Sequence, residues 1–334
     1  QYASIKKLLK AEKFWASFFS FGNQRYIWRM PFHFGDWLSP GENAKQWRHK
    51  GPWIATAYFY NTAHIAAKIA KELKKYEDER KFRKLMKKIE SAYRAVFLNE
   101  DGLLKEEFQT AYLCPIHFGM LTAAERQKMG NRLAQMVAEN NYKIATGFLG
   151  TPYLLFALSD TGHVNEAYRV LLNEECPGWL YAVKQGATTI WERWDALLPD
   201  GSVNLSQDQA NGKAATSADF DPEDQSAPSM TSFNHYAYGA VGDWLYRRVA
   251  GLETLTPGWR HFRVAPQPGG ELTWAEAHTQ TPYGKACSHW KIEGNRFVLT
   301  VEVPARTTCE VVLPDRTKRT LTKGIHTLQC PYGP

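Results

Sequence analysis

The chain has 334 residues, of which 44% are hydrophobic, enough for one large globular core or two ordinary ones. Its formal net charge is +7, but much of the excess lies in residues 68–90, where Lys and Arg alternate with Glu and Asp at helical spacing without a nucleic-acid motif. The composition therefore excludes a disordered chain, and the basic run predicts a solvated helix face rather than a nucleic-acid partner. No apolar run approaches the roughly 18 residues of a membrane span, so no membrane partner is expected either.

Helical periodicity dominates from residue 1 to about residue 252. Apolar residues at a period near 3.6 predict helices over residues 5–19, 52–74 and on to 97, 121–139 with a break at Gly130, 152–159, 165–172 and 233–249. The connections carry Gly, Pro and Trp, and no strand pattern alternates regularly with the helices. This arrangement is typical of an all-helical toroid of stacked helix pairs rather than of an α/β sheet.

After "GLETLTPGW" the period changes to two. In "RFVLTVEVP" the apolar residues that alternate with a second set are Phe297, Leu299, Val301 and Val303. Short runs of this kind continue to the end of the chain, bounded by Pro, Gly and Asn. The sequence therefore predicts a mainly α domain over residues 1–254, followed by a small antiparallel β-sandwich over residues 255–334.

Residues 200–230 are rich in Ser, Ala, Asp and Gln and carry no periodicity, so we expect a long loop or a lid over a site. Their "DFDPED" lacks the ligand spacing and the central glycine of a calcium loop. The five cysteines include no C-x-x-C pair and predict neither a zinc site nor a disulfide framework. Cys309 and Cys330 are expected as free thiols, with a cross-strand pair as the alternative in an oxidising compartment. Neither a metal nor a cofactor is expected.

The segment "TTIWERWDA" surrounds a carboxylate with aromatic rings. Glu192 lies between Trp191 and Trp194, and rings on both sides can desolvate its carboxyl and tune it for proton transfer. The alternative is an ion pair between Glu192 and Arg193 or another basic group, with the tryptophans in the core.

Two further segments combine aromatic and polar residues. "FHFGDWLSP" places Asp36 and Trp37 on a turn, and "TSFNHYAYG" places Asn234 and His235 at the start of a helix. His235 is either a ligand contact or a structural histidine. Because aromatic rings stack on the apolar faces of sugars while Asp, Glu, His and Asn reach hydroxyl groups, the three clusters together predict a carbohydrate ligand.

Four segments occur together in this chain: "FGDWLSP", "ATGFLGTPYLLFALSDTGHVNEAYRVLL", "CPGWLYAVKQGATTIWERWDALLPDGS" and "MTSFNHYAYGAVGDWLYRRVAGL". In this order they resemble the α-L-rhamnosidases of glycoside hydrolase family 78, and the resemblance covers nearly the whole chain. It implies an (α/α)6 barrel followed by a C-terminal β-sandwich. It also implies hydrolysis of terminal α-L-rhamnose, from a glycoside or polysaccharide, with inversion at the anomeric carbon.

The resemblance also implies roles for single residues. Glu192, in "TTIWE", matches the general base of the family, and His235, in "SFNHY", matches a histidine that lines the rhamnose pocket. Trp37 and Trp194 are similar to aromatic walls of that pocket, and Asp36 is expected to brace its loop more than to react. The expected substrate contacts are His235, Trp194, Trp37, Trp191, Asn234 and Asp36.

The chain departs from the family pattern in two places. Residues 205–229 look like an insertion beside the cleft, and nothing matches the Asp- and Arg-rich segment, ending in Gly-Trp, that holds the general acid of the family. The opening "QYASIKKLLKAEKFW" resembles the middle of a family helix. We therefore expect the C-terminal part of a longer enzyme, with an incomplete barrel that recruits the N-terminal remainder or a second chain.

These departures lead to the expectation that the chain alone does not hydrolyse rhamnosides. The alternatives are a noncatalytic carbohydrate-binding remnant of such an enzyme, and a related toroid glycosidase or polysaccharide lyase. The compartment stays open, because the chain begins with Gln1 and shows no signal peptide.

Overall fold

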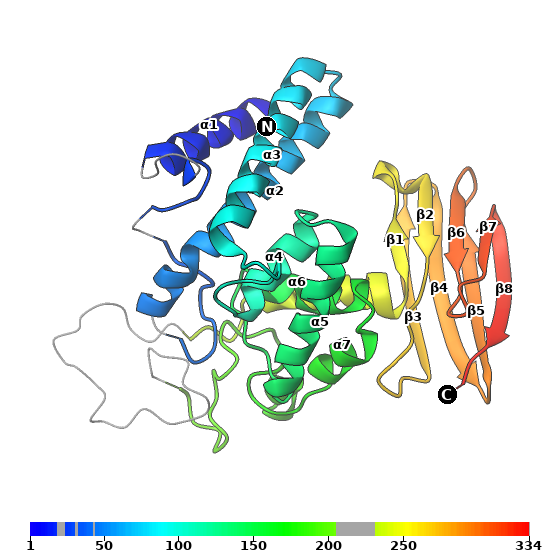
Figure 1. Cartoon of the computed structure of the whole chain (residues 1–334). Coiled ribbons are helices and arrows are strands. Elements are labelled where there is room, and N and C mark those ends of the chain that lie inside the picture. Colours follow the sequence, from blue (N-terminus) through cyan, green and yellow to red (C-terminus); the bar gives the residue numbers. More distant parts are fainter. Residues whose placement is uncertain (19–23, 31–32, 43, 205–230, 334) are drawn as a thin grey trace. The chain divides into compact units, whose positions relative to one another are not determined.

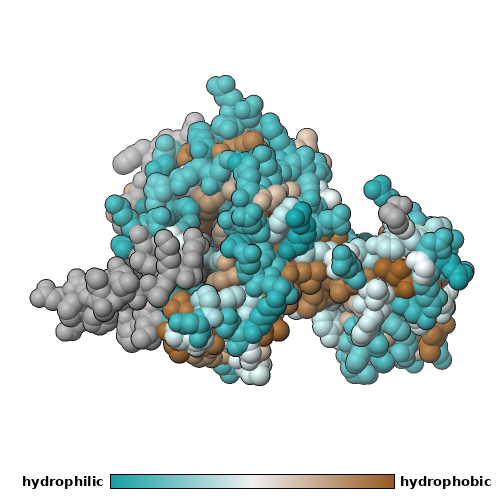
Figure 2. Space-filling view, turned by 90° about the horizontal axis from the view of Figure 1, so that it is seen from below, coloured by the Kyte–Doolittle hydropathy of each residue, from teal (hydrophilic) through white to brown (hydrophobic). Residues whose placement is uncertain are grey.

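The structure is a computed structural model that describes residues 1–18, 24–30, 33–42, 44–204 and 231–333. It divides into two compact units, Gln1–Tyr238 and Gly239–Pro334. The long loop predicted over residues 200–230 lies outside the described residues from 205 onwards, as does the insertion over residues 205–229. Figure 2 shows hydrophilic side chains over most of the face in view, with smaller hydrophobic patches between them. Among the helices described, none is both long and apolar enough to cross a bilayer.

Helices form the first unit, and Figure 1 shows how they lie side by side. They are α1 (Tyr2–Phe18), α2 (Ala44–Glu72), α3 (Tyr76–Phe97), α4 (Gln109–Phe118), α5 (Ala123–Glu139), α6 (Thr151–Asp160), α7 (Val164–Leu171) and α8 (Trp179–Lys184). Several consecutive helices pack on each other, most extensively α2 on α3, and α4 contacts α2, α5 and α6. The predicted mainly helical domain of helix hairpins is confirmed.

The basic run of the sequence forms the solvated face of α3. One side of this helix is buried through Ile89, Tyr93 and Phe97 at helical spacing. Ion pairs one turn apart also lie along the helix, Glu77 with Lys81 and Glu79 with Arg83. The charge alternation in this stretch is therefore accounted for by an amphipathic helix.

The helix break predicted at Gly130 is wrong, because α5 runs unbroken from its capping box, formed by Thr122 and Glu125, to Glu139. A Cβ atom at position 130 would lie 2.4 Å from the Cβ of Thr161, directly after α6. Gly130 is therefore a packing residue that lets α5 approach this turn. Glycine lowers the helix propensity of α5, and the close contact with Thr161 offsets that loss.

Other helix boundaries also differ from the prediction. α2 begins at Ala44 and passes through Pro52, which the sequence pattern placed at a helix start. α4 was not predicted, because nine of its ten residues are buried and a helix buried all round shows no amphipathic period. The helix expected over residues 233–249 is a 3₁₀ turn (Ala237–Ala240), α9 (Val241–Trp244) and a π turn (Leu245–Val249).

The second unit contains two four-stranded sheets. Their strands are β1 (Leu252–Thr254), β2 (His261–Val264), β3 (Trp274–Thr281), β4 (Gly284–Glu293), β5 (Arg296–Val303), β6 (Thr308–Val312), β7 (Lys318–Leu321) and β8 (Gly324–Pro331). The sheet orders are β1-β2-β6-β7 and β3-β4-β5-β8. Every pairing is antiparallel except β2 with β6, which is parallel. The predicted β-sandwich is confirmed, and the alternating residues of β5 are all buried. The five cysteines are free thiols.

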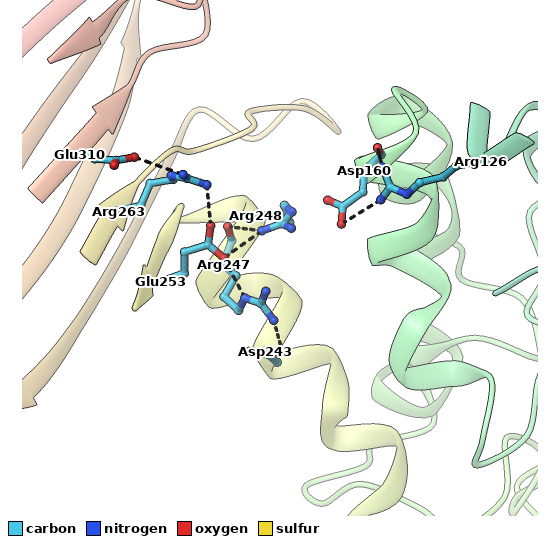
Figure 3. A network of polar contacts seen from close by, with 8 residues as sticks. All are labelled: Arg126, Asp160, Asp243, Arg247, Arg248, Glu253, Arg263 and Glu310. Carbon is cyan, nitrogen blue, oxygen red and sulfur yellow. Dashed lines mark hydrogen bonds and ion pairs between the residues drawn. The ribbon is translucent and has the colours of Figure 1, made fainter. Parts of the chain in front are cut away.

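An ion network ties the π turn to the sheet inside this second unit (Figure 3). Glu253 on β1 accepts from Arg247 and Arg248, at 3.1 and 3.5 Å, and from Arg263 on β2 at 3.5 Å. Arg263 also contacts Glu310 on β6 at 3.1 Å. Because Glu253 is mostly buried and shared among three guanidinium groups, this network holds the helix end and three strands in one arrangement.

Candidate active site

The carboxylate of Asp36 is enclosed by a loop between α5 and α6. Its Oδ1 accepts from the backbone N–H groups of Leu149 and Gly150 at 2.7 and 3.1 Å. Its Oδ2 accepts from the N–H of Gly147 at 2.8 Å and from the hydroxyl of Thr110 at 2.5 Å. Burial raises the pKa of Asp36, and these four donors act against that rise. Since a carboxylate has about four acceptor positions, these donors fill those of Asp36, which supports its expected role as a loop brace more than its expected contact with substrate.

The same loop holds Trp37 in place. The N–H of Phe148 donates to the carbonyl oxygen of Trp37 at 3.0 Å, and a Cβ atom at Gly147 would lie 2.1 Å from that oxygen. The indole ring of Trp37 lies 5.0 Å from that of Trp47 and meets Phe34 edge-on at 5.3 Å. Trp37 is partly exposed, so its side chain keeps some contact with solvent.

Glu192 lies where two chain segments pair through their backbones. Its N–H donates to the carbonyl of Ser232 at 2.9 Å, and the N–H of His235 donates to the carbonyl of Ile190 at 2.8 Å. The N–H of Ser232 in turn donates to Oε2 of Glu192 at 3.1 Å. Only 6% of Glu192 is exposed, and Oε1 has no hydrogen-bond donor among the residues that the structure describes. One oxygen is thus held and the other is available.

Arg193 forms its ion pair with Asp195, whereas the sequence suggested Glu192 as its partner. Nε of Arg193 lies 3.1 Å from Oδ1 of Asp195, and both residues are buried. Asn204 donates to Oδ2 of Asp195 at 2.7 Å. Burial raises the pKa of Asp195, and Arg193 opposes the rise. The structure therefore pairs Arg193 with Asp195, where the alternative interpretation of the sequence had paired Arg193 with Glu192.

Trp191 and Trp194 are buried, at 5% and 3% exposure. Trp194 stacks on Tyr238 with ring centres 3.8 Å apart and donates from Nε1 to the carbonyl of Thr146 at 3.2 Å. Trp191 meets Phe233 edge-on at 5.4 Å. Neither tryptophan presents an open ring face, because other side chains already cover it. This burial favours a packing role for both rings over the expected contact with substrate, which stays a prediction.

The imidazole of His235 is partly exposed and has a defined hydrogen-bonding state. Its Nδ1 accepts from the N–H of Ala237 at 3.2 Å, so the neutral ring carries its proton on Nε2. The ring stacks on Phe148 with centres 4.9 Å apart and planes at 26°. The preceding Asn234 is exposed, and its N–H donates to Oγ of Ser232 at 3.2 Å. His235 thus presents a hydrogen-bond donor, Nε2–H, as a sugar hydroxyl requires.

Phe148 was missed by the sequence reasoning, although it connects the clusters. Its backbone bonds to Trp37 and its ring supports His235, which brings two of the expected site residues next to one loop. The signal for this role was the pair Gly147 and Gly150, since glycines that close together indicate a close backbone approach. In the described ranges, no group of three or more His, Cys, Asp or Glu side chains lies close enough to hold a metal ion.

Helices that pack in pairs, followed by a two-sheet β domain, are the architecture of the six-hairpin class of folds. A family model described as the bacterial α-L-rhamnosidase 6 hairpin glycosidase domain matches residues 2–249, and one described as the bacterial α-L-rhamnosidase C-terminal domain matches residues 251–327. The chain belongs to the bacterial α-L-rhamnosidase family.

Similar proteins agree with this assignment. An α-L-rhamnosidase of Streptomyces avermitilis is 36% identical over 281 residues, which are 84% of this chain and 24% of that protein, and one of Formosa agariphila is 36% identical over 287 residues, 84% and 28%. A crystal structure of the Aspergillus terreus α-L-rhamnosidase has a TM-score of 0.83 at 31% identity, covering 98% of this chain and 36% of its own. The Streptomyces avermitilis enzyme complexed with L-rhamnose has a TM-score of 0.81 at 32% identity, covering 99% and 31%. The chain thus spans roughly a quarter to a third of the length of these relatives.

Proposed function

We propose that this chain carries the general-base half of the active site of an inverting α-L-rhamnosidase. The observation that supports this most is the carboxylate of Glu192, which the N–H of Ser232 holds through one oxygen while the other oxygen has no donor among the described residues. A base needs this combination, because a fixed group is aimed at one point and a free oxygen can accept a proton from water.

In the proposed reaction Glu192 takes a proton from a water molecule that attacks the anomeric carbon of rhamnose from the face opposite the leaving group. An acid on the other face, roughly 6.5–9.5 Å away, protonates the departing oxygen. Asp36 and Asp195, whose oxygens are occupied by other donors, are poor candidates for this acid, and we assign it to a segment outside this chain. His235 donates to a sugar hydroxyl from Nε2, and Trp37 forms an apolar wall.

The family and its relatives support the choice of substrate. The relatives that match most of this chain are named α-L-rhamnosidases, and one was crystallised with L-rhamnose. By this likeness the substrate is a glycoside or polysaccharide with terminal α-L-rhamnose, and the N-terminal remainder of the enzyme or a second chain completes the barrel. The second candidate function is carbohydrate binding without turnover, which the missing acid segment favours.

The test has a binding part and a catalytic part. Calorimetric titration of the purified chain with L-rhamnose should give saturable binding that His235→Ala weakens. The chain alone should not hydrolyse 4-nitrophenyl α-L-rhamnoside, whereas the complete gene product should release β-L-rhamnose first, as seen by NMR. Absence of rhamnose binding overturns the proposal, α-L-rhamnose as the first product overturns inversion, and binding without turnover by the complete protein favours the second candidate.

A further inference from the structure

The imidazole of His235 needs outside support to present a hydrogen-bond donor in one direction. The torsion that turns a histidine ring is broad and roughly two-fold, so a half-turn exchanges the nitrogen Nε2 with the carbon Cε1. Among the described residues, the bond from the N–H of Ala237 to Nδ1, at 3.2 Å, is the one hydrogen bond that this ring makes. A single bond at the long end of the usual range restrains the ring weakly, so packing contacts decide its plane.

Phe148 supplies such a contact. Its ring lies 4.9 Å from that of His235, with the two planes at 26°. The ring of Tyr236 also lies against His235, at 5.2 Å, but it is 88% exposed and touches no other ring in the part of the chain that the structure describes. Because nothing else holds it, Tyr236 can follow the imidazole, whereas Phe148 can set its plane.

Phe148 is itself held through its backbone. Its N–H donates to the carbonyl of Trp37 at 3.0 Å. The N–H groups of Gly147 and Leu149, on either side of it, donate to the buried carboxylate of Asp36 at 2.8 and 2.7 Å. Three successive peptide groups are thus anchored to one short segment, and the backbone that carries the ring has little freedom.

The edge of the Phe148 ring is held as well, by Tyr238. The two rings meet at 75° with centres 5.4 Å apart, and Tyr238 is 2% exposed. Tyr238 also stacks on Trp194, two residues after Glu192, with centres 3.8 Å apart. The ring that supports His235 therefore rests on the same buried tyrosine that packs against the segment of the proposed base.

We propose that Phe148 is a positioning residue of the rhamnose site, whose ring holds the imidazole of His235 in the plane that aims Nε2–H at the sugar. The proposal rests on the function proposed above, which assigns His235 to a sugar hydroxyl. In this role Phe148 acts on affinity through His235 and makes no contact with the sugar. Leucine in its place would fill much of the same volume but has no flat face, and would leave the imidazole free to turn.

Nitrogen NMR of the full chain without ligand tests the effect on the imidazole. Long-range hydrogen–nitrogen correlation spectra distinguish Nδ1 from Nε2, and His235→Ala identifies the signal by its loss. The native signal should be that of one neutral tautomer protonated at Nε2, because Ala237 donates to Nδ1. In Phe148→Leu, and in Phe148→Met as a second variant without a flat ring, the two nitrogen shifts should move towards each other. Phe148→Tyr keeps the ring and should retain the native spectrum.

Calorimetric titration with L-rhamnose tests the effect on binding. Phe148→Leu should weaken binding about 3–10-fold, as expected for the loss of one ring pair, and Phe148→Tyr should bind as the native chain does. In the His235→Ala background, Phe148→Leu should cause no further loss, because its effect passes through the imidazole. The matched control is Phe297→Leu, which removes a buried ring 5.5 Å from Trp290 in the second unit. It should change neither the His235 signal nor the rhamnose affinity.

The other outcomes each overturn a stated part. An unchanged His235 signal, or an unchanged affinity, in Phe148→Leu overturns the positioning role while the rhamnose site stands. An equal loss of affinity with and without the imidazole means that Phe148 acts by another route, and overturns it as well. If the native chain does not bind L-rhamnose, the proposed function fails and the role of Phe148 in binding fails with it. The spectra without ligand separate that failure from a failure of Phe148 to order the imidazole.

Discussion

Two carboxylates of the first unit, each next to a tryptophan in the sequence, have opposite environments. Asp36 accepts four hydrogen bonds, three of them from backbone N–H groups of one loop. Glu192 accepts one from Ser232, and its second oxygen has no donor in the part of the chain that the structure describes. Both are buried, so burial does not distinguish them.

The difference teaches that the number of donors around a carboxylate decides its role. A carboxylate that accepts from several buried backbone N–H groups cannot turn to a ligand without leaving those donors unpaired, which costs free energy. Its role is therefore structural. A carboxylate held at one oxygen keeps the other for a ligand or a water molecule. A pattern of Trp beside Asp or Glu is equally consistent with both roles, and mutation of the two carboxylates separates them.

The largest effect is expected at Glu192. Glu192→Gln keeps the size of the side chain and its bond from Ser232 but removes the base, so hydrolysis of 4-nitrophenyl α-L-rhamnoside by the complete protein should fall by about 10²–10⁴-fold. The urea midpoint of unfolding should stay within error of the native value, because no buried donor loses its acceptor. Near-native turnover by a folded variant would contradict the role given to Glu192.

Replacing Asp36 should lower the stability of the fold, in contrast to the replacement of Glu192, which should lower turnover. Asp36→Ala strands three backbone N–H groups and a buried hydroxyl, so the free energy of unfolding should fall by about 3–5 kcal/mol. Urea unfolding followed by circular dichroism measures this. Asp200→Ala, at an exposed turn, is the control and should change stability by about 0.5 kcal/mol or less. A variant of Asp36 with unchanged stability would show that the loop does not depend on its brace.

The two tryptophans of the region extend the comparison with smaller effects. Trp194→Phe removes the bond to Thr146 and part of the stack on Tyr238, and should lower the free energy of unfolding by about 1–2 kcal/mol. Trp37→Phe should leave stability nearly unchanged and weaken L-rhamnose binding about 2–5-fold through a smaller apolar wall. Weaker rhamnose binding by Trp194→Phe, together with lower stability of Trp37→Phe, would identify Trp194 as the apolar wall of the rhamnose site.

The smallest effect concerns a third carboxylate, Glu12 on α1. Its Oε1 accepts from Thr62 on α2, whereas Oε2 is buried without a partner among the described residues, and burial raises its pKa to about 7. Because this folded-state pKa lies above the ordinary value of 4.5, the folded chain holds its proton more tightly, and stability falls as pH rises from about 4.5 to 7. Glu12→Gln should therefore raise the midpoint of thermal unfolding by roughly 2–4 °C at pH 8 and hardly at pH 5.

The control for this test is Glu72→Gln, at an exposed position of α2, which should shift neither midpoint. An equal gain for Glu12→Gln at both pH values would mean that the charge of Glu12 is not the cause.

The sequence predicted the fold best where one face of an element is buried. The hydrophobic residues of α3 and β5 recur with clear periods of 3.6 and 2, because each element has one solvent-exposed side and one buried side. α4 was missed because almost all of it is buried, and α5 was split because Gly130 is equally consistent with a break and with a close contact. The parallel direction of β2 and β6 leaves no mark on either strand, because a side-chain period carries no information about the partner.

The candidate site could be predicted as a set of segments but not as a set of roles. Clusters of Trp with Asp, Glu or His do mark the loops that the structure joins around Phe148. Which members are buried depends on tertiary contacts, such as Tyr238 on Trp194, between residues far apart in the sequence. The sequence also did not distinguish Asp195 from Glu192 as the partner of Arg193, because both carboxylates lie within two residues of it.

The parallel pairing of β2 with β6 has a consequence for the order of folding. These strands are separated by residues 265–307, which contain β3, β4 and β5, whereas those three strands join through short antiparallel turns. Local hairpins close quickly. Pairing of strands that are far apart in the sequence is slower, because closing the longer loop costs more chain entropy. In a pulsed hydrogen-exchange experiment the amides of β4 and β5 should therefore gain protection before those of β2 and β6, so that the sheet containing β1 is the last part of the second unit to assemble.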